Sequence, residues 1–143
     1  MVIDAIKNGI VIDHIEAGKS MRMYQILGLD KLECSVAIIK NVPSAKMGRK
    51  DIIKIDDSID IDLDVLGYID PNITVNIIRN GERIKKFHVE LPDQITNVIR
   101  CRNPRCITST EQELDHVFKL TDKANGVYRC VYCESKAKNS PGN

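Results

Sequence analysis

The stretch that decides the fold of the first part of the chain is I-T-V-N-I-I-R-N-G-E-R-I-K-K-F-H-V, residues 73–89. Two candidate strand runs, 73–79 and 82–89, flank the pair Asn80-Gly81. Asn-Gly between two such runs is the strongest short signal for a β-hairpin, because both residues accept the positive φ angles of a type I′ turn. The sequence therefore predicts an antiparallel hairpin here.

Upstream of this hairpin, strand and helix signals alternate. Three runs rich in Ile and Val have the length and composition of strands: residues 9–16, 34–40 and 50–55. Residues 17–27 place apolar side chains at helical spacing and end at Gly28, and residues 62–69 form a second candidate helix that ends before Pro71. The order β-α-β-β-α-β, extended by a hairpin, predicts an α+β domain of the ferredoxin-like split βαβ type, with one antiparallel sheet and two helices on one face.

Composition and charge limit the class of protein. The chain has 143 residues, of which 43% are hydrophobic and 29% charged, and its formal net charge is +1. This composition is typical of globular proteins, and the near-neutral balance argues against a main role in coating nucleic acid or anionic lipid. No apolar run approaches a membrane span, and the first residues lack the pattern of a secretory signal. We therefore expect a cytoplasmic protein without membrane contact, whose cysteines stay reduced.

A domain boundary is expected at Leu91-Pro92-Asp93, because proline cannot donate to a β-ladder and restricts the residue before it. This boundary gives two expected domains, residues 1–92 and residues 93–143. The second domain holds four of the five cysteines. The fifth, Cys34, lies in an apolar run and is expected to be a small core residue.

The four cysteines of the second domain follow the spacing C-x4-C-x23-C-x2-C: Cys101, Cys106, Cys130 and Cys133. Two short knuckles brought together across a hairpin supply the four thiolates that Zn²⁺ binds tetrahedrally. Four protein ligands leave no position for water, so the pattern predicts one structural zinc ion per chain. We expect a small β-rich, zinc-ribbon-like domain whose folding depends on the metal.

Four arginines crowd the cysteine knuckles: Arg100, Arg102, Arg105 and Arg129. They either contact nucleic-acid phosphates or offset the negative charge of a tetrathiolate zinc site. Aromatic residues make up only 4% of the chain, which favours the second interpretation, because single-strand binders stack bases on aromatic rings. A zinc-ribbon protein that binds nucleic acid remains the alternative function. No Ser-His-Asp or Cys-His arrangement stands out, so the sequence predicts no enzyme.

The predicted sheet also carries a candidate ligand site. His14 follows Asp13 in the first strand, where adjacent residues face opposite sides of a sheet. Basic residues come from other strands of the same sheet: Lys50, Lys54, Arg83, Lys85 and Lys86. Converging cations with one imidazole suit a polyphosphate, and a carboxylate suits a ribose hydroxyl. The alternative is that these lysines are merely solvated, as is common on exposed strands.

Several motifs together resemble one known family: V-I-D-H-I at 11–15, G-R-K-D-I-I-K-I at 48–55, T-V-N at 74–76, L-P-D at 91–93, C-R-N-P-R-C-I at 101–107 and C-V-Y-C-E at 130–134. They resemble the regulatory chain of aspartate carbamoyltransferase, over about residues 4–134. The resemblance implies a non-catalytic subunit whose first domain binds CTP and UTP as inhibitors and ATP as activator. It also implies that this domain pairs regulatory chains into dimers, and that the zinc domain docks onto catalytic chains, so that regulatory dimers bridge catalytic trimers.

The resemblance further implies which residues hold the nucleotide: Asp4, Ala5, Ile6, Asp13, His14, Ile52, Lys54, Asn76, Ile78 and Lys86. In the family pattern, Asp13 lies near the ribose, His14 contacts a phosphate and Lys86 meets the triphosphate. The four paired cysteines match the zinc ligands. Gly81 and Arg83 depart from the pattern, which has an aromatic and an aliphatic residue there, so the base preference stays open.

Overall fold

The computed structural model describes residues 6–137 and consists of two compact units, one that ends at Glu90 and one that begins at Leu91. The first unit contains β1 (Gly9–Glu16), α1 (Ser20–Ile26), the 3-10 helix η1 (Leu29–Lys31), β2 (Val36–Ser44), β3 (Gly48–Ile55), α2 (Leu63–Ile69), β4 (Thr74–Arg79) and β5 (Glu82–His88). The second contains β6 (Gln94–Thr96), α3 (Ile107–Thr110), β7 (Val117–Asp122) and β8 (Val127–Cys130).

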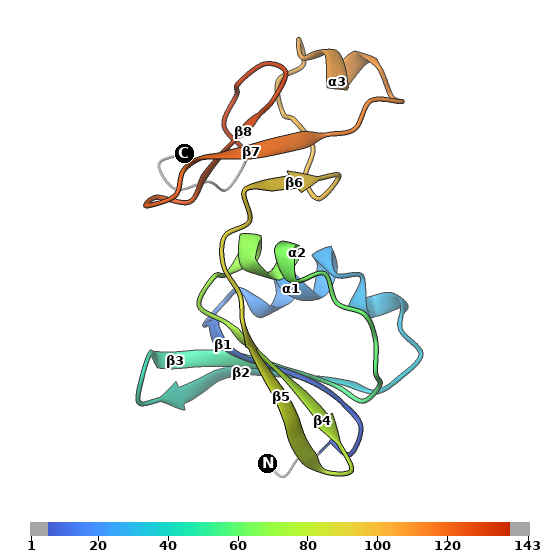
Figure 1. Cartoon of the computed structure of the whole chain (residues 1–143), viewed down its shortest axis with the longest axis vertical. Coiled ribbons are helices and arrows are strands. Elements are labelled where there is room, and N and C mark those ends of the chain that lie inside the picture. The colour runs from blue at the N-terminus through green and yellow to red at the C-terminus, as the bar shows by residue number, and fades with distance from the viewer. Residues whose placement is uncertain (1–5, 138–143) are drawn as a thin grey trace. The chain divides into compact units, whose positions relative to one another are not determined.

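The first unit is a five-stranded antiparallel sheet in the order β2-β3-β1-β4-β5. Both helices, α1 and α2, lie on the same face of this sheet (Figure 1). The predicted α+β fold is therefore confirmed, including the hairpin between β4 and β5. At its turn, Asn80 has φ 52° and Gly81 has φ 77°, the two positive angles that a type I′ turn requires.

Isoleucine and valine fill the core between the sheet and the helices, because the chain has few aromatic residues. Ile12 of β1 pairs with Ile53 of β3 and with Val75 of β4, and all three side chains are buried. Alternation along each strand then sends the neighbouring residues to the face that the helices leave uncovered. We call this uncovered face the outer face.

A β-bulge interrupts the alternation in β1. Ile12 pairs with Ile53 and Ile15 pairs with Asp51, so Asp13 and His14 together lie opposite a single residue of β3. His14 has φ 60°, and the extra residue returns Ile15 to the core, where it is fully buried. The expectation that Asp13 and His14 face opposite sides of the sheet is therefore wrong at this point, because it assumed regular pairing.

The second unit is smaller and is built on a three-stranded sheet in the order β6-β7-β8. Its core consists of Ile95, Phe118, Val127 and Tyr128, all of them buried. The sheet is antiparallel, and the knuckle cysteines lie at and beyond its ends. This confirms the prediction of a small β-rich, cysteine-rich domain. Among the helices described in the two units, none is long and apolar enough to cross a bilayer.

Candidate functional site

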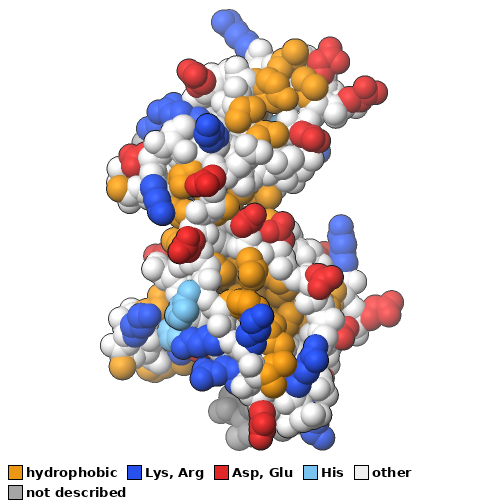
Figure 2. Space-filling view, viewed as in Figure 1, with side chains coloured by type: hydrophobic (Ala, Val, Ile, Leu, Met, Phe, Trp, Pro, Cys, Tyr) orange, Lys and Arg blue, Asp and Glu red, His pale blue; other side chains and the backbone are white. Residues whose placement is uncertain are grey.

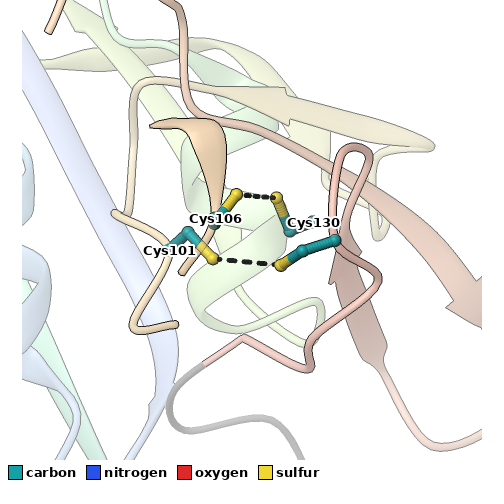
Figure 3. A group of neighbouring side chains, drawn as sticks. Cys101, Cys106 and Cys130 are labelled. Carbon is teal, nitrogen blue, oxygen red and sulfur yellow. Dashed lines mark hydrogen bonds between the residues drawn. The ribbon is translucent and has the colours of Figure 1, made fainter. Parts of the chain in front are cut away.

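The four knuckle cysteines meet at one point of the second unit. Cys101 Sγ lies 3.5 Å from Cys133 Sγ, Cys106 Sγ lies 3.7 Å from Cys130 Sγ, and all four sulfurs lie within 4.8 Å of one another (Figure 3). A zinc ion bound to four thiolates at about 2.3 Å holds neighbouring sulfurs about 3.8 Å apart. The arrangement therefore fits one tetrahedral zinc ion, with no open position for water.

Two hydroxyl groups lie beside these sulfurs, and a histidine binds the backbone of the first knuckle. Thr108 Oγ1 lies 3.1 Å from Cys106 Sγ, and Ser135 Oγ lies 3.3 Å from Cys133 Sγ. His116 accepts a hydrogen bond from the Cys101 N–H at Nδ1, which fixes the backbone of the first knuckle. Such outer contacts orient metal ligands and tune their basicity. Both hydroxyls occur two residues after a cysteine, a spacing by which sequence analysis could have found them.

Without a cation the pKa values of Cys101, Cys130 and Cys133 shift in different directions. Burial, reinforced by the neighbouring thiols, raises the pKa of Cys101 to about 12, and burial also raises the pKa of Cys130. For Cys133 burial is outweighed by hydrogen bonds, chiefly from Ser135, which lower its pKa to about 6. Four thiolates so close together repel one another, so the full ligand set ionises only with a bound cation.

The outer face of the first unit brings a second group of residues together. The register places Lys54 of β3 beside Val11 of β1, Val11 beside Asn76 of β4, and Asn76 beside Lys86 of β5. These residues form a row across four strands, which we call the cationic row because a lysine lies near each end. Ile52 and Ile78 lie on the same face by alternation, before and after this row. Basic and histidine side chains gather on this unit in Figure 2.

The bulge adds Asp13 and His14 to the outer face. Asp13 Oδ1 forms an ion pair with Lys50 Nζ at 2.9 Å, and His14 Nδ1 lies 2.9 Å from Thr74 Oγ1. Partial burial would raise the pKa of Asp13, but the Lys50 ammonium and the His14 N–H outweigh it and keep the pKa below its usual value. The group is thus a carboxylate paired with the Lys50 ammonium. Thr74 was missing from the sequence prediction, because its contact with His14 depends on the bulge.

Asn76 offers an acceptor at the middle of the cationic row. The residue is only 8% exposed, and Nδ2 donates to the Val11 carbonyl oxygen at 3.4 Å. The Oδ1 atom is buried and has no hydrogen-bond partner in the described part of the chain. A buried acceptor without a partner is costly, so a ligand that donates a hydrogen bond there would be favoured.

The segment before β1 lies against the hairpin turn at one end of the outer face. Lys7 O accepts a hydrogen bond from the Gly81 N–H at 3.0 Å, and Asn8 Oδ1 accepts one from the Asn80 N–H at 3.2 Å. Ile6, a predicted site residue, precedes these contacts directly and is half-buried. The other two predicted residues of this segment, Asp4 and Ala5, lie outside the described residues.

Comparisons with known proteins agree over both units. The family model described as "Aspartate carbamoyltransferase regulatory chain, allosteric domain" matches residues 1–90, and the model of the metal binding domain of the same chain matches residues 93–140. This chain belongs to the aspartate carbamoyltransferase regulatory chain family. It is a regulatory chain with an allosteric and a metal-binding domain, and the four-cysteine site fits one zinc ion.

Several relatives are similar over nearly their whole length. The regulatory chain of Clostridium tetani is 52% identical over 135 residues, which cover 94% of this chain and 94% of the relative. That of Clostridium botulinum is 51% identical over 134 residues, covering 94% and 92%. The more distant chain of Bifidobacterium longum is 43% identical over 138 residues, covering 96% and 99%. All three are named aspartate carbamoyltransferase regulatory chains.

Proposed function

We propose that this chain is the non-catalytic regulatory subunit of a cytoplasmic aspartate carbamoyltransferase. In this proposal the expected domain of residues 1–92 binds nucleotide effectors, with CTP and UTP as inhibitors and ATP as activator. The expected domain of residues 93–143 docks onto the catalytic chains through its zinc site, and dimers of the regulatory chain bridge catalytic trimers. The reducing cytoplasm suits the four thiols, which bind metal only while they are reduced.

The cationic row is the observation that supports nucleotide binding most strongly. Lys54 and Lys86 offer charge to phosphates from opposite sides of Asn76, and His14 lies on the same face. The partnerless Oδ1 atom of Asn76 accepts a hydrogen bond from a ribose hydroxyl or a base amino group. Half-buried Ile52 and Ile78 give apolar surface for the sugar and base. Cations, an acceptor and apolar surface on one face together suit a nucleoside triphosphate.

Exposed apolar side chains beside the metal site support docking through the second unit. Ile107 follows Cys106 and is 50% exposed, and the neighbours Val131 and Tyr132 between the last two cysteines are 43% and 48% exposed. Large apolar side chains at such exposed positions are typical of protein interfaces. The relatives' names point to the catalytic chain of aspartate carbamoyltransferase as the partner.

Two adjacent lysines of β5 give a matched test of nucleotide binding. Lys86 pairs with Asn76 on the outer face, whereas Lys85 pairs with Ile77 and lies with Nζ 4.6 Å from the centre of the Phe87 ring. A charge-assisted phosphate contact contributes about 1.5–3 kcal/mol. We therefore expect Lys86→Gln to weaken CTP and ATP binding roughly 10- to 100-fold by isothermal titration calorimetry, and Lys85→Gln to change it less than about twofold.

Two results would contradict this site. Equal effects of the two substitutions would mean that only the general charge of β5 matters, and no CTP, UTP or ATP binding to the wild-type chain would contradict the proposed effector function itself. The zinc content and the circular dichroism spectrum of each variant serve as controls, because both lysines are exposed and neither lies in the core.

A further inference from the structure

The segment that joins the two units is held in place on the side of the first unit. After β5 ends at His88, Val89 is buried in the core and Glu90 packs its backbone against Gly67 of α2. A Cβ atom at Gly67 would lie 1.9 Å from the Glu90 carbonyl oxygen, so this close approach requires glycine. The backbone of Glu90 therefore follows the position of β5 and α2.

The same segment is held on the side of the second unit by two hydrogen bonds. The Tyr128 hydroxyl donates to the Pro92 carbonyl oxygen at 2.5 Å, and the Leu120 N–H donates to the Asp93 carbonyl oxygen at 2.8 Å. The Tyr128 side chain is fully buried in the core of the second unit. The backbone of Pro92 and Asp93 therefore follows the positions of β7 and β8.

A single residue, Leu91, lies between the anchored backbones of Glu90 and Pro92. The ring of Pro92 fixes its own φ angle and restricts Leu91 to extended conformations. The connection between the two anchored segments is thus a single residue long. On one side the connection follows β5, which carries Lys86. On the other side the Pro92 carbonyl oxygen accepts the hydrogen bond of Tyr128, which lies two residues before Cys130 in β8.

We propose that the Tyr128 hydroxyl is a coupling residue, which passes a nucleotide-dependent displacement of β5 to the strand that carries the metal site. The inference rests on the proposed effector function. A ligand shifts an equilibrium only through contacts that differ between two states, and coupling between distant sites needs elements that move together. The hydrogen bond to Pro92 makes the connecting segment and β8 such an element.

The substitution Tyr128→Phe tests this role, because it removes the hydroxyl and leaves the buried ring. In holoenzyme assembled with catalytic chains, we expect zinc content, assembly and CTP affinity of Tyr128→Phe to stay within about twofold of wild type. The CTP-induced change in the aspartate concentration for half-maximal rate should fall by half or more. The matched control is Thr121→Val, which removes a hydrogen bond from the Thr121 hydroxyl to the Val127 carbonyl oxygen in the same sheet, away from the boundary.

An unchanged CTP effect in Tyr128→Phe, or an equal loss in Thr121→Val, would overturn the inference. Absence of CTP binding to the wild type would instead contradict the effector function, and the inference with it. A second measurement needs no variant: CTP should change hydrogen exchange at the Leu120 amide, which donates to Asp93, but not at the Gly126 amide, which donates to Lys123 in a turn. No change at Leu120 while the amides of β5 respond to CTP would also overturn it.

Discussion

Asp51 is a buried side chain that binds the backbone of two other segments of the first unit. It lies in the middle of β3, is fully buried, and accepts hydrogen bonds from the N–H groups of Gly18, Ser20 and Asn41. These three donors belong to the start of α1 and to the irregular part of β2. Burial would raise the pKa of Asp51, but hydrogen bonds from Ser20, Asn41 and Gly18 outweigh it and lower the pKa.

We expect Asp51→Asn to lower the free energy of unfolding by about 1–3 kcal/mol at neutral pH, because an amide nitrogen would face buried N–H donors. Since the pKa is lowered in the folded state, the stabilisation by Asp51 is present above the unfolded pKa of about 3.9 and is lost as the pH falls through the folded pKa. In urea unfolding, the difference in the free energy of unfolding between wild type and Asp51→Asn should therefore become smaller below about pH 4. Exposed Asp57→Asn is the control, and equal stability of Asp51→Asn and wild type at neutral pH would refute the role.

The backbone conformation of His14 is a feature that could not be predicted from the sequence. The motif V-I-D-H-I has a regular strand pattern, and nothing in its composition indicates an inserted residue. The bulge arises from the pairing of β1 with β3, and the positive φ of His14 follows from that pairing. Contacts of Asp13 with Lys50 and of His14 with Thr74 were consequently visible only in three dimensions.

At the scale of elements, local chemistry made the β4–β5 hairpin and the cysteine knuckles predictable. Asn80-Gly81 dictates its turn, and the cysteine spacing dictates which sulfurs meet. Element boundaries were less predictable. Helix α1 starts at Ser20 rather than at residue 17, because Gly18 has φ 101°, and β2 continues to Ser44 through Asn41 with φ 61°. Both differences involve a residue with a positive φ angle, Gly18 or Asn41, whose N–H donates a hydrogen bond to Asp51.

The second unit should fold only around its metal. Its core is small, and four of its buried or half-buried side chains are the knuckle cysteines. We expect Cys106→Ala to lower zinc from one ion to none per chain by mass spectrometry, and to expose the amides of β7 and β8 to hydrogen exchange while β1 and β3 stay protected. Cys34→Ala, a substitution outside the site, is the control. A variant that kept zinc and an ordered β8 would contradict a structural metal.

At the scale of the whole molecule, the two units have different parts in the proposed function. The first carries the cationic row, and the second carries the metal site with exposed Ile107, Val131 and Tyr132 beside it. Family membership was predictable because short motifs cover both units, from D-H-I in β1 to C-V-Y-C after β8. Effector identity was not, because Gly81 and Arg83 stand where the family pattern has an aromatic and an aliphatic residue.

In the proposed function, this chain assembles with catalytic chains through its metal-binding unit. Sedimentation velocity of the chain mixed with aspartate carbamoyltransferase catalytic trimers, with and without a zinc chelator, tests it most directly. We predict a species heavier than either component, which dissociates when zinc is removed because the docking unit then unfolds. Absence of a heavier species while the chain is folded and zinc is bound would contradict the account, as would an assembly that survives complete removal of zinc.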